Sequence, residues 1–366
     1  MLVALDLPGG DRFVDELRRA WDAGDAVLPV DQRLPRVVKR QLLSRLGAGA
    51  IVETSGGRRS LSEGRPTEPG DALVVATSGS TGEPKGVVLT HDAVRASAEA
   101  TSRRLGVRDD DHWLACLPMA HVGGLSVVTR ALHTGTRLTV HPGFDAAAVE
   151  GSGASLVSLV PTALRRIDAT LFRTIVLGGS PPPADRPANT VTTYGMTESG
   201  SGVVYDRLPL EGVDVRVLDT EIHLRCPMLL RCYRDGTDPK TSDGWFPTGD
   251  LGALDDDGLL TVHGRRGDLI ITGGENVWPD PVEALLRDHP AVGDAAVVGV
   301  ADDEWGEVVT ALIVPSESEV PLAELRDFVK ERAPAHWAPR RVVLVRELPR
   351  TPLGKLIRQQ LPALAR

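Results

Sequence analysis

The segment TSGSTGEPKG, residues 77–86, joins two runs that have the composition of buried strands. DALVVATS (71–78) leads into it and GVVLT (86–90) follows it, and both are rich in β-branched residues. The segment itself holds three glycines, four hydroxyl side chains and one lysine. Glycines leave backbone N–H groups free to face an anion, hydroxyl groups add donors, and Lys85 adds positive charge. We therefore interpret it as a candidate phosphate-binding loop, with a flexible hairpin turn as the alternative.

This loop differs from the Walker A motif, which needs glycine directly before its lysine and Ser or Thr opening a helix after it. Here Pro84 precedes Lys85, and Gly86 leads into a strand. The pattern excludes a P-loop NTPase. Lysine is also rare in this chain, with only five among 41 Lys and Arg residues, so a lysine placed among glycines indicates that its compact ammonium group is required.

The rest of the chain alternates between strand and helix patterns. Helices are expected over 13–24, 36–48 and 91–106, and a polar loop over 54–70. Apolar strand-like runs at 112–119, 136–141, 155–161, 173–180 and 189–195 predict a largely parallel α/β sheet. Short strands and turns follow from about residue 212, and a compact α+β unit with its own core follows residue 264.

Composition bounds the class of protein. A length of 366 residues predicts two or three folding units, and 42% apolar with 25% charged residues is typical of a globular protein. A net charge of −9 argues against nucleic-acid and anionic-membrane partners. Three cysteines without ligand-like spacing indicate reduced thiols, and the chain has no leader pattern or run of about 18 apolar residues. We expect a cytoplasmic protein without a membrane span. The sequence leaves the oligomeric state open, and a homodimer is one of the alternatives.

Three further motifs carry candidate chemistry. In TTYGMTESGSG (192–202), Tyr194 suits stacking on a nucleobase, Thr197 suits a phosphate oxygen and Glu198 suits Mg²⁺ carried on ATP. In DGWFPTGDLG (243–252), Asp250 suits two ribose hydroxyls. In PRTPLGKLIR (349–358), Lys355 lies in a loop bounded by Pro and Gly. Taken singly, each has an ordinary alternative: a strand-ending turn, an Asx turn and a solvated tail lysine.

Six motifs in order carry a family resemblance: TSGSTGEPKG, LPMAHVGGL, TYGMTES, GWFPTGD, GRRGD with ITGGENVWP, and PRTPLGK. Together they resemble the adenylate-forming superfamily of acyl-CoA synthetases, adenylation domains and luciferases, over residues 71 to 358. The resemblance implies an α/β fold with a large adenylation domain over 1–264, built of mostly parallel sheets plus a β-rich subdomain. A small mobile α+β domain over 265–366 follows it. With only about seventy residues before the loop, the N-terminal subdomain is expected to be reduced.

The resemblance also implies an activity and a set of roles. A carboxylate reacts with ATP to give an acyl-adenylate and pyrophosphate, and the acyl group then passes to CoA, with Mg²⁺ as the metal. The implied catalytic residues are Lys355, Thr197, Glu198 (also the metal ligand) and His121, which lines the acyl pocket unless it is a core histidine. The implied ATP-binding residues are Thr77, Ser78, Gly79, Ser80, Thr81, Gly82, Lys85, Gly179, Tyr194, Gly195, Asp250 and Arg265. Gly274 is expected beside the CoA channel, unless it is an ordinary turn glycine.

Two features narrow or complicate this assignment. The family commonly has Asp or Lys at its hinge, where this chain has Gly267, and a glycine tolerates the large change in φ and ψ that a hinge needs. The short chain and GGENVWP resemble actinobacterial o-succinylbenzoate–CoA ligases of menaquinone biosynthesis. The alternatives are another aryl or acyl carboxylate–CoA ligase, a stand-alone adenylation enzyme that loads a carrier protein, and a non-catalytic nucleotide-binding protein. The presence of Lys85, Glu198 and Lys355 favours an active enzyme.

Overall fold

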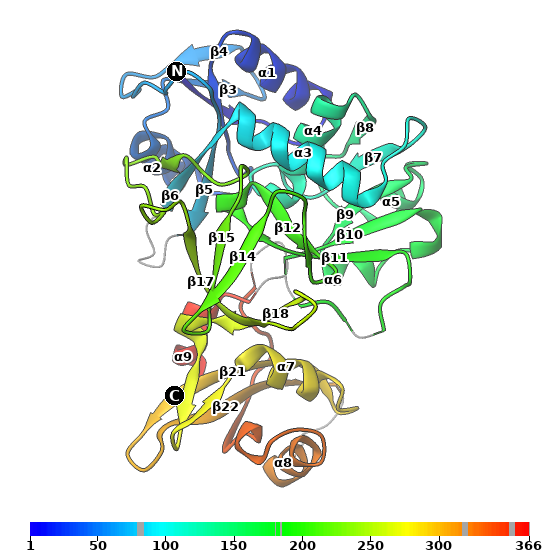
Figure 1. The fold of residues 1–366 in the computed structure, drawn as a ribbon, viewed down its shortest axis with the longest axis vertical. Helices are drawn as coiled ribbons and strands as arrows, with labels where there is room; N and C mark the ends of the chain where they lie inside the picture. The colour runs from blue at the N-terminus through cyan, green and yellow to red at the C-terminus, as the bar shows by residue number, and fades with distance from the viewer. Residues whose placement is uncertain (79–83, 180, 184, 317–320, 351–355, 366) are drawn as a thin grey trace. The chain divides into compact units, whose positions relative to one another are not determined.

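The structure is a computed structural model that describes residues 1–366 except 79–83, 180, 184, 317–320, 351–355 and 366. The chain forms two compact units (Figure 1). Unit 1 comprises Met1–Val215 and Leu224–Pro247, and unit 2 comprises Arg216–His223 and Thr248–Arg366. The mobile domain that we predict over 265–366 lies within unit 2, and its boundary after residue 264 remains a prediction.

The first sheet of unit 1 carries the candidate phosphate loop. Its strand order is β16-β6-β5-β2-β1-β3-β4, in which β5, β2, β1 and β3 are parallel neighbours and the outer pairs are antiparallel. The strands are β1 (Leu2–Asp6), β2 (Ala26–Pro29), β3 (Ala50–Glu53), β4 (Arg58–Ser60), β5 (Asp71–Ser78), β6 (Pro84–Thr90) and β16 (Cys232–Tyr233). Helix α2 (Arg36–Leu46) buries Leu42 and Leu46 in the core of this sheet. The helix ends at Gly47, whose φ of 64° favours glycine.

The second sheet of unit 1 has the order β13-β12-β11-β10-β9-β7-β8, parallel from β11 to β8. Its strands are β7 (His112–Ala115), β8 (Arg137–Val140), β9 (Leu156–Leu159), β10 (Thr174–Leu177), β11 (Thr190–Met196), β12 (Ser201–Tyr205) and β13 (Leu208–Pro209). The helical segments of unit 1 are α1 (Asp11–Asp22), α3 (His91–Leu105), α4 (Val122–Thr134), α5 (Ala146–Glu150), α6 (Pro161–Leu164), η1 (Ala169–Leu171) and η2 (Thr197–Ser199). Helix α3 packs along α4 (Figure 1). It begins where the Thr90 hydroxyl accepts a hydrogen bond from Ala93 N over 3.1 Å.

Unit 2 contains a five-stranded sheet covered by helices. The order is β20-β19-β22-β21, with β23 also paired to β22. Its elements are β19 (Ile270–Thr272), β20 (Glu275–Val277), β21 (Val292–Asp302), β22 (Gly306–Pro315), β23 (Arg341–Leu344), α7 (Pro279–Arg287), α8 (Leu322–Lys330), α9 (Leu361–Leu364), η3 (Arg266–Asp268), η4 (Ala335–Trp337) and η5 (Arg358–Gln360). Val282 and Leu286 of α7 and Leu325 of α8 lie in its core.

A four-stranded sheet, β14 (Asp214–Leu218), β15 (Glu221–Arg225), β17 (Phe246–Leu254) and β18 (Leu260–Arg265), has the order β14-β15-β17-β18. The residue limits of the two units fall inside its first three strands. This sheet is the β-rich part that the sequence predicts. The predicted α/β class is confirmed.

Several local predictions hold, and two features were missed. The three N-terminal helices are confirmed to within two residues. The loop expected over 54–70 contains the short strand β4, whose exposed polar side chains give no strand signal because it pairs only through its backbone at a sheet edge. Helix α4 was also not expected. Gly124 permits it, because a Cβ there would lie 2.3 Å from the carbonyl oxygen of Leu117.

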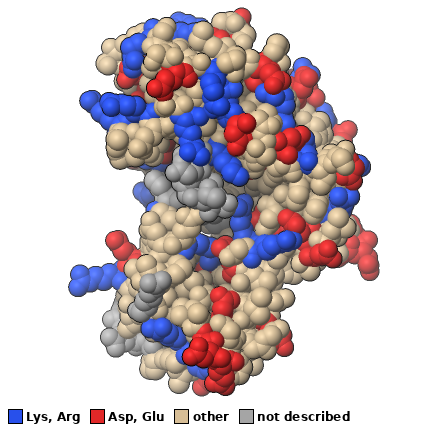
Figure 2. All heavy atoms as spheres, turned by 90° about the vertical axis from the view of Figure 1, so that its left-hand side faces the viewer, with Lys and Arg blue, Asp and Glu red and all other residues tan. Residues whose placement is uncertain are grey.

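The charges on the surface and the state of the cysteines agree with what the composition predicts. Lys and Arg side chains are accompanied by Asp and Glu on the face shown in Figure 2. All three cysteines are free, as predicted, and burial raises the pKa of the Cys116 thiol to about 12. In the described ranges, no helix combines the length and apolar character needed to cross a bilayer.

Candidate active site

The hairpin of β5 and β6 positions the two ends of the candidate phosphate loop. Thr77 pairs with Lys85 across the hairpin, and the backbone of Ser78 pairs with that of Pro84. The predicted ATP-binding residues Gly79, Ser80, Thr81 and Gly82 lie outside the described residues. The loop's last glycine has a packing reason, because a Cβ on Gly86 would lie within 2.9 Å of side chains on three sides.

A tyrosine that the sequence analysis did not single out connects Lys85 with Glu198. Tyr233 lies on β16, opposite Val87 of β6. The Nζ atom of Lys85 lies 4.9 Å from the centroid of the Tyr233 ring, within the range of a cation–π contact. The Tyr233 hydroxyl donates a hydrogen bond to Oε1 of Glu198 over 3.0 Å. A cation, a hydroxyl and a carboxylate therefore meet at the hairpin, although they come from three distant segments.

Hydrogen bonds from the Ser199 side chain and from the Leu230 backbone hold the turn that carries Thr197 and Glu198. The buried Ser199 hydroxyl accepts a hydrogen bond from Met196 N over 3.1 Å and lies 2.8 Å from the Ser201 carbonyl oxygen. Leu230 N donates to the carbonyl oxygen of Glu198 over 2.7 Å. The side chain of Glu198 therefore starts from a defined backbone position. Its hard oxygen atoms suit Mg²⁺, whose other ligands are usually phosphate and water oxygens.

Gly179, Tyr194 and Gly195 lie at the carboxyl ends of neighbouring parallel strands. Gly179 follows β10 with a φ of 87°, and Tyr194 lies near the end of β11. A Cβ on Gly195 would lie 2.2 Å from the Ser201 carbonyl oxygen, so the close approach of β12 requires glycine. In open α/β sheets, ligands bind outside the carboxyl ends of the strands, so this edge is a suitable place for a nucleotide.

Asp250 and Arg265, the predicted ribose-binding pair, face each other within unit 2. They are partners in the β17–β18 ladder, and Arg265 Nε lies 2.9 Å from Asp250 Oδ1. Asp250 is buried, whereas the Arg265 side chain is exposed. Asp250 N donates to the Thr248 hydroxyl over 3.0 Å, and that hydroxyl donates to the Ile222 carbonyl over 2.8 Å. The backbone at Asp250 is therefore well held.

The two predicted C-terminal glycines differ in why glycine suits them. Gly267 lies in η3 with an ordinary φ and open space where a Cβ would be, so this conformation does not require glycine there. Gly273 and Gly274 form the turn between β19 and β20, with φ of 58° and 84°. Turn geometry alone therefore accounts for glycine at 274. Lys355 lies outside the described residues.

His121 lies at the start of helix α4 beside a polar pair from the loop after β2. Its Nε2 is 3.7 Å from Asp31 Oδ2 and 3.4 Å from an Arg33 guanidinium nitrogen. Burial raises the pKa of the Asp31 carboxyl, but the nearby His121 ring and hydrogen bonds from Arg33 outweigh it and hold that pKa far below its usual range. The His121 side chain is 40% exposed, so it is not a buried core histidine.

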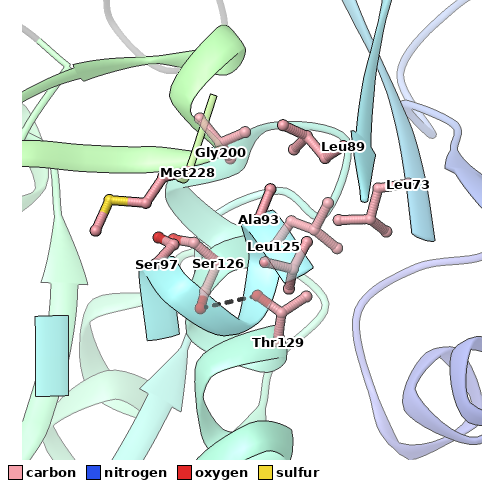
Figure 3. A pocket seen from close by; sticks show the side chains of 11 residues that line it. Leu73, Leu89, Ala93, Ser97, Leu125, Ser126, Thr129, Gly200 and Met228 are labelled. Atoms are coloured by element: carbon pink, nitrogen blue, oxygen red, sulfur yellow. Dashed lines mark hydrogen bonds between the residues drawn. The ribbon is translucent and has the colours of Figure 1, made fainter. Parts of the chain in front are cut away.

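A small cavity lies in unit 1 between the hairpin, helices α3 and α4, and Gly200 at the end of η2 (Figure 3). Leu89, Val122, Leu125 and Met228 are among the side chains that line it, and Ser97 and Ser126 add hydroxyl groups. Its volume of about 10 Å³ holds roughly one water molecule. The cavity is thus too small for an aromatic acid in this conformation.

Arg130 is a second residue that the sequence analysis missed. It lies on α4 with 2% of its surface exposed, 4.8 Å from the Trp113 ring and 3.3 Å from the Ser201 hydroxyl. Its Nε and one terminal nitrogen have no hydrogen-bond partner, and no ion pair to it is found among the described residues. Burial lowers its pKa. The sequence does contain a signal for this residue, because Arg130 is the single charge in the apolar run VGGLSVVTRALHT (122–134).

Comparisons with known proteins show which family this chain resembles. The family model described as AMP-binding enzyme matches residues 17–228, and the model described as AMP-binding enzyme C-terminal domain matches residues 281–355. A 2-succinylbenzoate–CoA ligase of Bacillus cereus (strain Q1) is 37% identical over 332 residues, covering 79% of this chain and 69% of that relative.

Solved structures show the same similarity. The o-succinylbenzoate CoA synthetase of Bacillus subtilis, in complex with its acyl-adenylate intermediate, matches with a TM-score of 0.88 and 28% identity, over 98% of this chain and 87% of that one. The same enzyme in complex with ATP and a magnesium ion matches with a TM-score of 0.85 and 27% identity, over 98% and 89%.

Proposed function

The chain belongs to the AMP-binding enzyme family, and from this we propose that it is an ATP-dependent acid–CoA ligase whose acid is 2-succinylbenzoate. The carboxylate attacks the α-phosphate of ATP and pyrophosphate leaves. The thiol of CoA then attacks the acyl carbon of the acyl-adenylate, so that the thioester forms and AMP leaves. The proposal includes a cytoplasmic location, where ATP and CoA are available, and a place in menaquinone biosynthesis.

The observation that carries the activity is the contact of Tyr233 with both Lys85 and Glu198. The ammonium group of Lys85 and the carboxylate of Glu198 lie beside the β5–β6 hairpin. Such a pair suits a nucleoside triphosphate with its magnesium ion. In this proposal Lys85 and Thr77 hold the outer phosphates, Thr197 contacts the α-phosphate, and Glu198 holds the metal, which neutralises phosphate charge when bound.

The remaining roles follow from the same proposal. Tyr194 and Gly179 lie beside the adenine, and Asp250 with Arg265 holds the ribose. Lys355 places its positive charge where negative charge grows during adenylation. His121 lines the pocket for the acid, with Asp31 and Arg33 beside its ring.

Arg130 supports a dicarboxylic acid as the substrate. An unpaired guanidinium in a protein interior costs several kcal/mol unless a charged partner reaches it. 2-Succinylbenzoate has one carboxylate to activate and a second on its ring, and the second would provide that partner. Ser126 and Thr129, on the same helix as Arg130, line the small cavity described above, which would have to widen before an aromatic acid could enter it.

The test compares two acids and two enzymes. 4-Oxo-4-phenylbutanoate keeps the carboxylate that is activated and lacks the ring carboxylate. Wild-type enzyme should prefer 2-succinylbenzoate by about 100-fold in kcat/KM, roughly 3 kcal/mol. Arg130→Gln should lose most of this preference while Arg130→Lys keeps part of it.

Equal use of the two acids by wild-type enzyme would contradict the dicarboxylate proposal and favour another aryl or acyl acid. Transfer to a carrier-protein thiol in place of CoA would identify the enzyme as a carrier-loading one.

A further inference from the structure

We propose that Arg350 and Arg358 are positioning residues for Lys355, because they fix both ends of the segment that carries it. This inference rests on the role that the proposed function gives to Lys355. The two arginines lie on either side of residues 351–355, and both belong to unit 2.

The base of this segment is closed by backbone contacts. Arg350 and Leu356 form an antiparallel bridge, and Ile357 N donates to the Pro349 carbonyl over 2.9 Å. Leu348 is buried in a small core on the sheet, against which Leu356 packs. Arg350 and Leu356, the described residues on either side of 351–355, are therefore neighbours.

Arg358 holds the outgoing end through three carboxylates. Its Nε lies 3.1 Å from Asp268 Oδ2, one terminal nitrogen lies 3.0 Å from Glu283 Oε1, and the other contacts Asp280. Glu283 on α7 is almost fully buried and also accepts a hydrogen bond from Val297 N over 2.9 Å. Burial raises the pKa of Glu283, and the Arg358 charge opposes that rise. A buried carboxylate of this kind depends on its arginine partner.

Arg350 holds the incoming end through Asp294 on β21. Its terminal nitrogen lies 2.6 Å and its Nε 3.1 Å from Asp294 Oδ2, which is a two-pronged contact. The other oxygen of Asp294 accepts from Arg287 Nε over 3.1 Å. The two ends are thus tied to α7 and β21, which pack against each other.

A lysine side chain is long and flexible, so its ammonium reaches a defined point only if its backbone is held. Misplacing a catalytic group by about 1 Å can reduce a rate by about 100-fold. Asp268 directly follows Gly267, the proposed hinge. The contact of Arg358 with Asp268 ties the residue that follows Leu356 and Ile357 to the chain just after that glycine.

The test separates the two half-reactions in the full chain. Arg350→Gln and Arg358→Lys should each lower the rate of acyl-adenylate formation at saturating ATP by about tenfold or more. Thioester formation from pre-made acyl-adenylate should stay within about twofold of wild type, because Lys355 is not needed there. Arg287→Gln is the matched control, since it removes a guanidinium from Glu283 and Asp294 without touching the Lys355 segment.

Arg350→Gln keeps the test decisive if Arg358 variants fail to fold, because Asp294 retains Arg287. Adenylation by Arg350→Gln that falls no further than in the Arg287→Gln control, or an equal loss in both half-reactions, would overturn the positioning role. If Lys355→Ala itself adenylates at the wild-type rate, the assignment of Lys355 in the proposed function is what fails.

Discussion

The hydroxyl of Tyr233 donates a hydrogen bond to Glu198 over 3.0 Å, while the ring of the same tyrosine faces the Lys85 ammonium at 4.9 Å. One side chain thus fixes both a candidate metal ligand and a candidate phosphate ligand. The two effects are separable by mutation, because phenylalanine keeps the ring and loses only the hydroxyl.

Tyr233→Phe should raise the Mg²⁺ concentration that half-saturates adenylation by about fivefold, since one hydrogen bond is worth about 1 kcal/mol. Glu198→Gln should raise it further, because the charged ligand itself is removed. The measurement is a Mg²⁺ titration of acid-dependent pyrophosphate release. Tyr205→Phe is the control, because that hydroxyl contacts Thr101 instead. If neither Tyr233→Phe nor Glu198→Gln changes the half-saturating Mg²⁺ concentration, Glu198 is a solvated turn residue and not a metal ligand.

Asp250→Asn should weaken recognition of the ribose. We expect a KM for ATP about tenfold higher and a smaller preference for ATP over 2′-deoxy-ATP, because a carboxylate accepts hydrogen bonds from hydroxyl groups more strongly than an amide does. Steady-state kinetics with both nucleotides measure this. Asp255→Asn, in the turn after β17, provides the control. A variant with the full wild-type preference would place the ribose elsewhere.

Gly274→Asn should leave pyrophosphate release intact and slow thioester formation if the backbone there borders the path to CoA. Asparagine suits the test because it tolerates the φ of 84°, whereas leucine would be strained by about 1–2 kcal/mol and would impair folding. Separate assays of the two half-reactions measure the effect. A folded Asn variant that makes the thioester at the normal rate would show that Gly274 is only a turn glycine.

Asp111→Asn should destabilise unit 1 in a pH-dependent way. Burial raises the pKa of Asp111, but hydrogen bonds from Arg173, from the Arg108 backbone and from Ser155 outweigh it, so that the pKa lies below its usual value. The carboxylate therefore stabilises the fold above about pH 4 and loses this effect as the pH falls further. Urea unfolding should show a loss of about 2 kcal/mol at pH 7 that shrinks as the pH falls below about 4. A gap that stays constant or widens would refute this account.

The sequence predicted the features that depend on neighbouring residues. The β5–β6 hairpin, the turn at Thr197 and Glu198, and the pairing region of Asp250 all have local signals in glycine, hydroxyl and β-branched residues. The contact of Tyr233 with Lys85 and Glu198 has no such signal, because it depends on β16 pairing with β6 across a long stretch of chain. Pairings of that kind follow from tertiary packing.

Two other residues show the limits of reading motifs alone. Arg130 lies inside an apolar helix, and its burial, with no carboxylate partner in the described part of the chain, becomes visible only when α4 is packed. Gly274 was interpreted through the CoA channel, but its positive φ gives it a simpler local reason. Side-chain burial singles out Arg130, and backbone geometry explains why glycine suits position 274.

The most direct test of the central claim is pyrophosphate release by the full chain with ATP and Mg²⁺, over a panel of carboxylic acids, with and without CoA. We predict that 2-succinylbenzoate supports release, and that adding CoA yields AMP and the 2-succinylbenzoyl thioester in equal amounts. Absence of release with 2-succinylbenzoate, or release without a CoA thioester when CoA is present, would contradict the account.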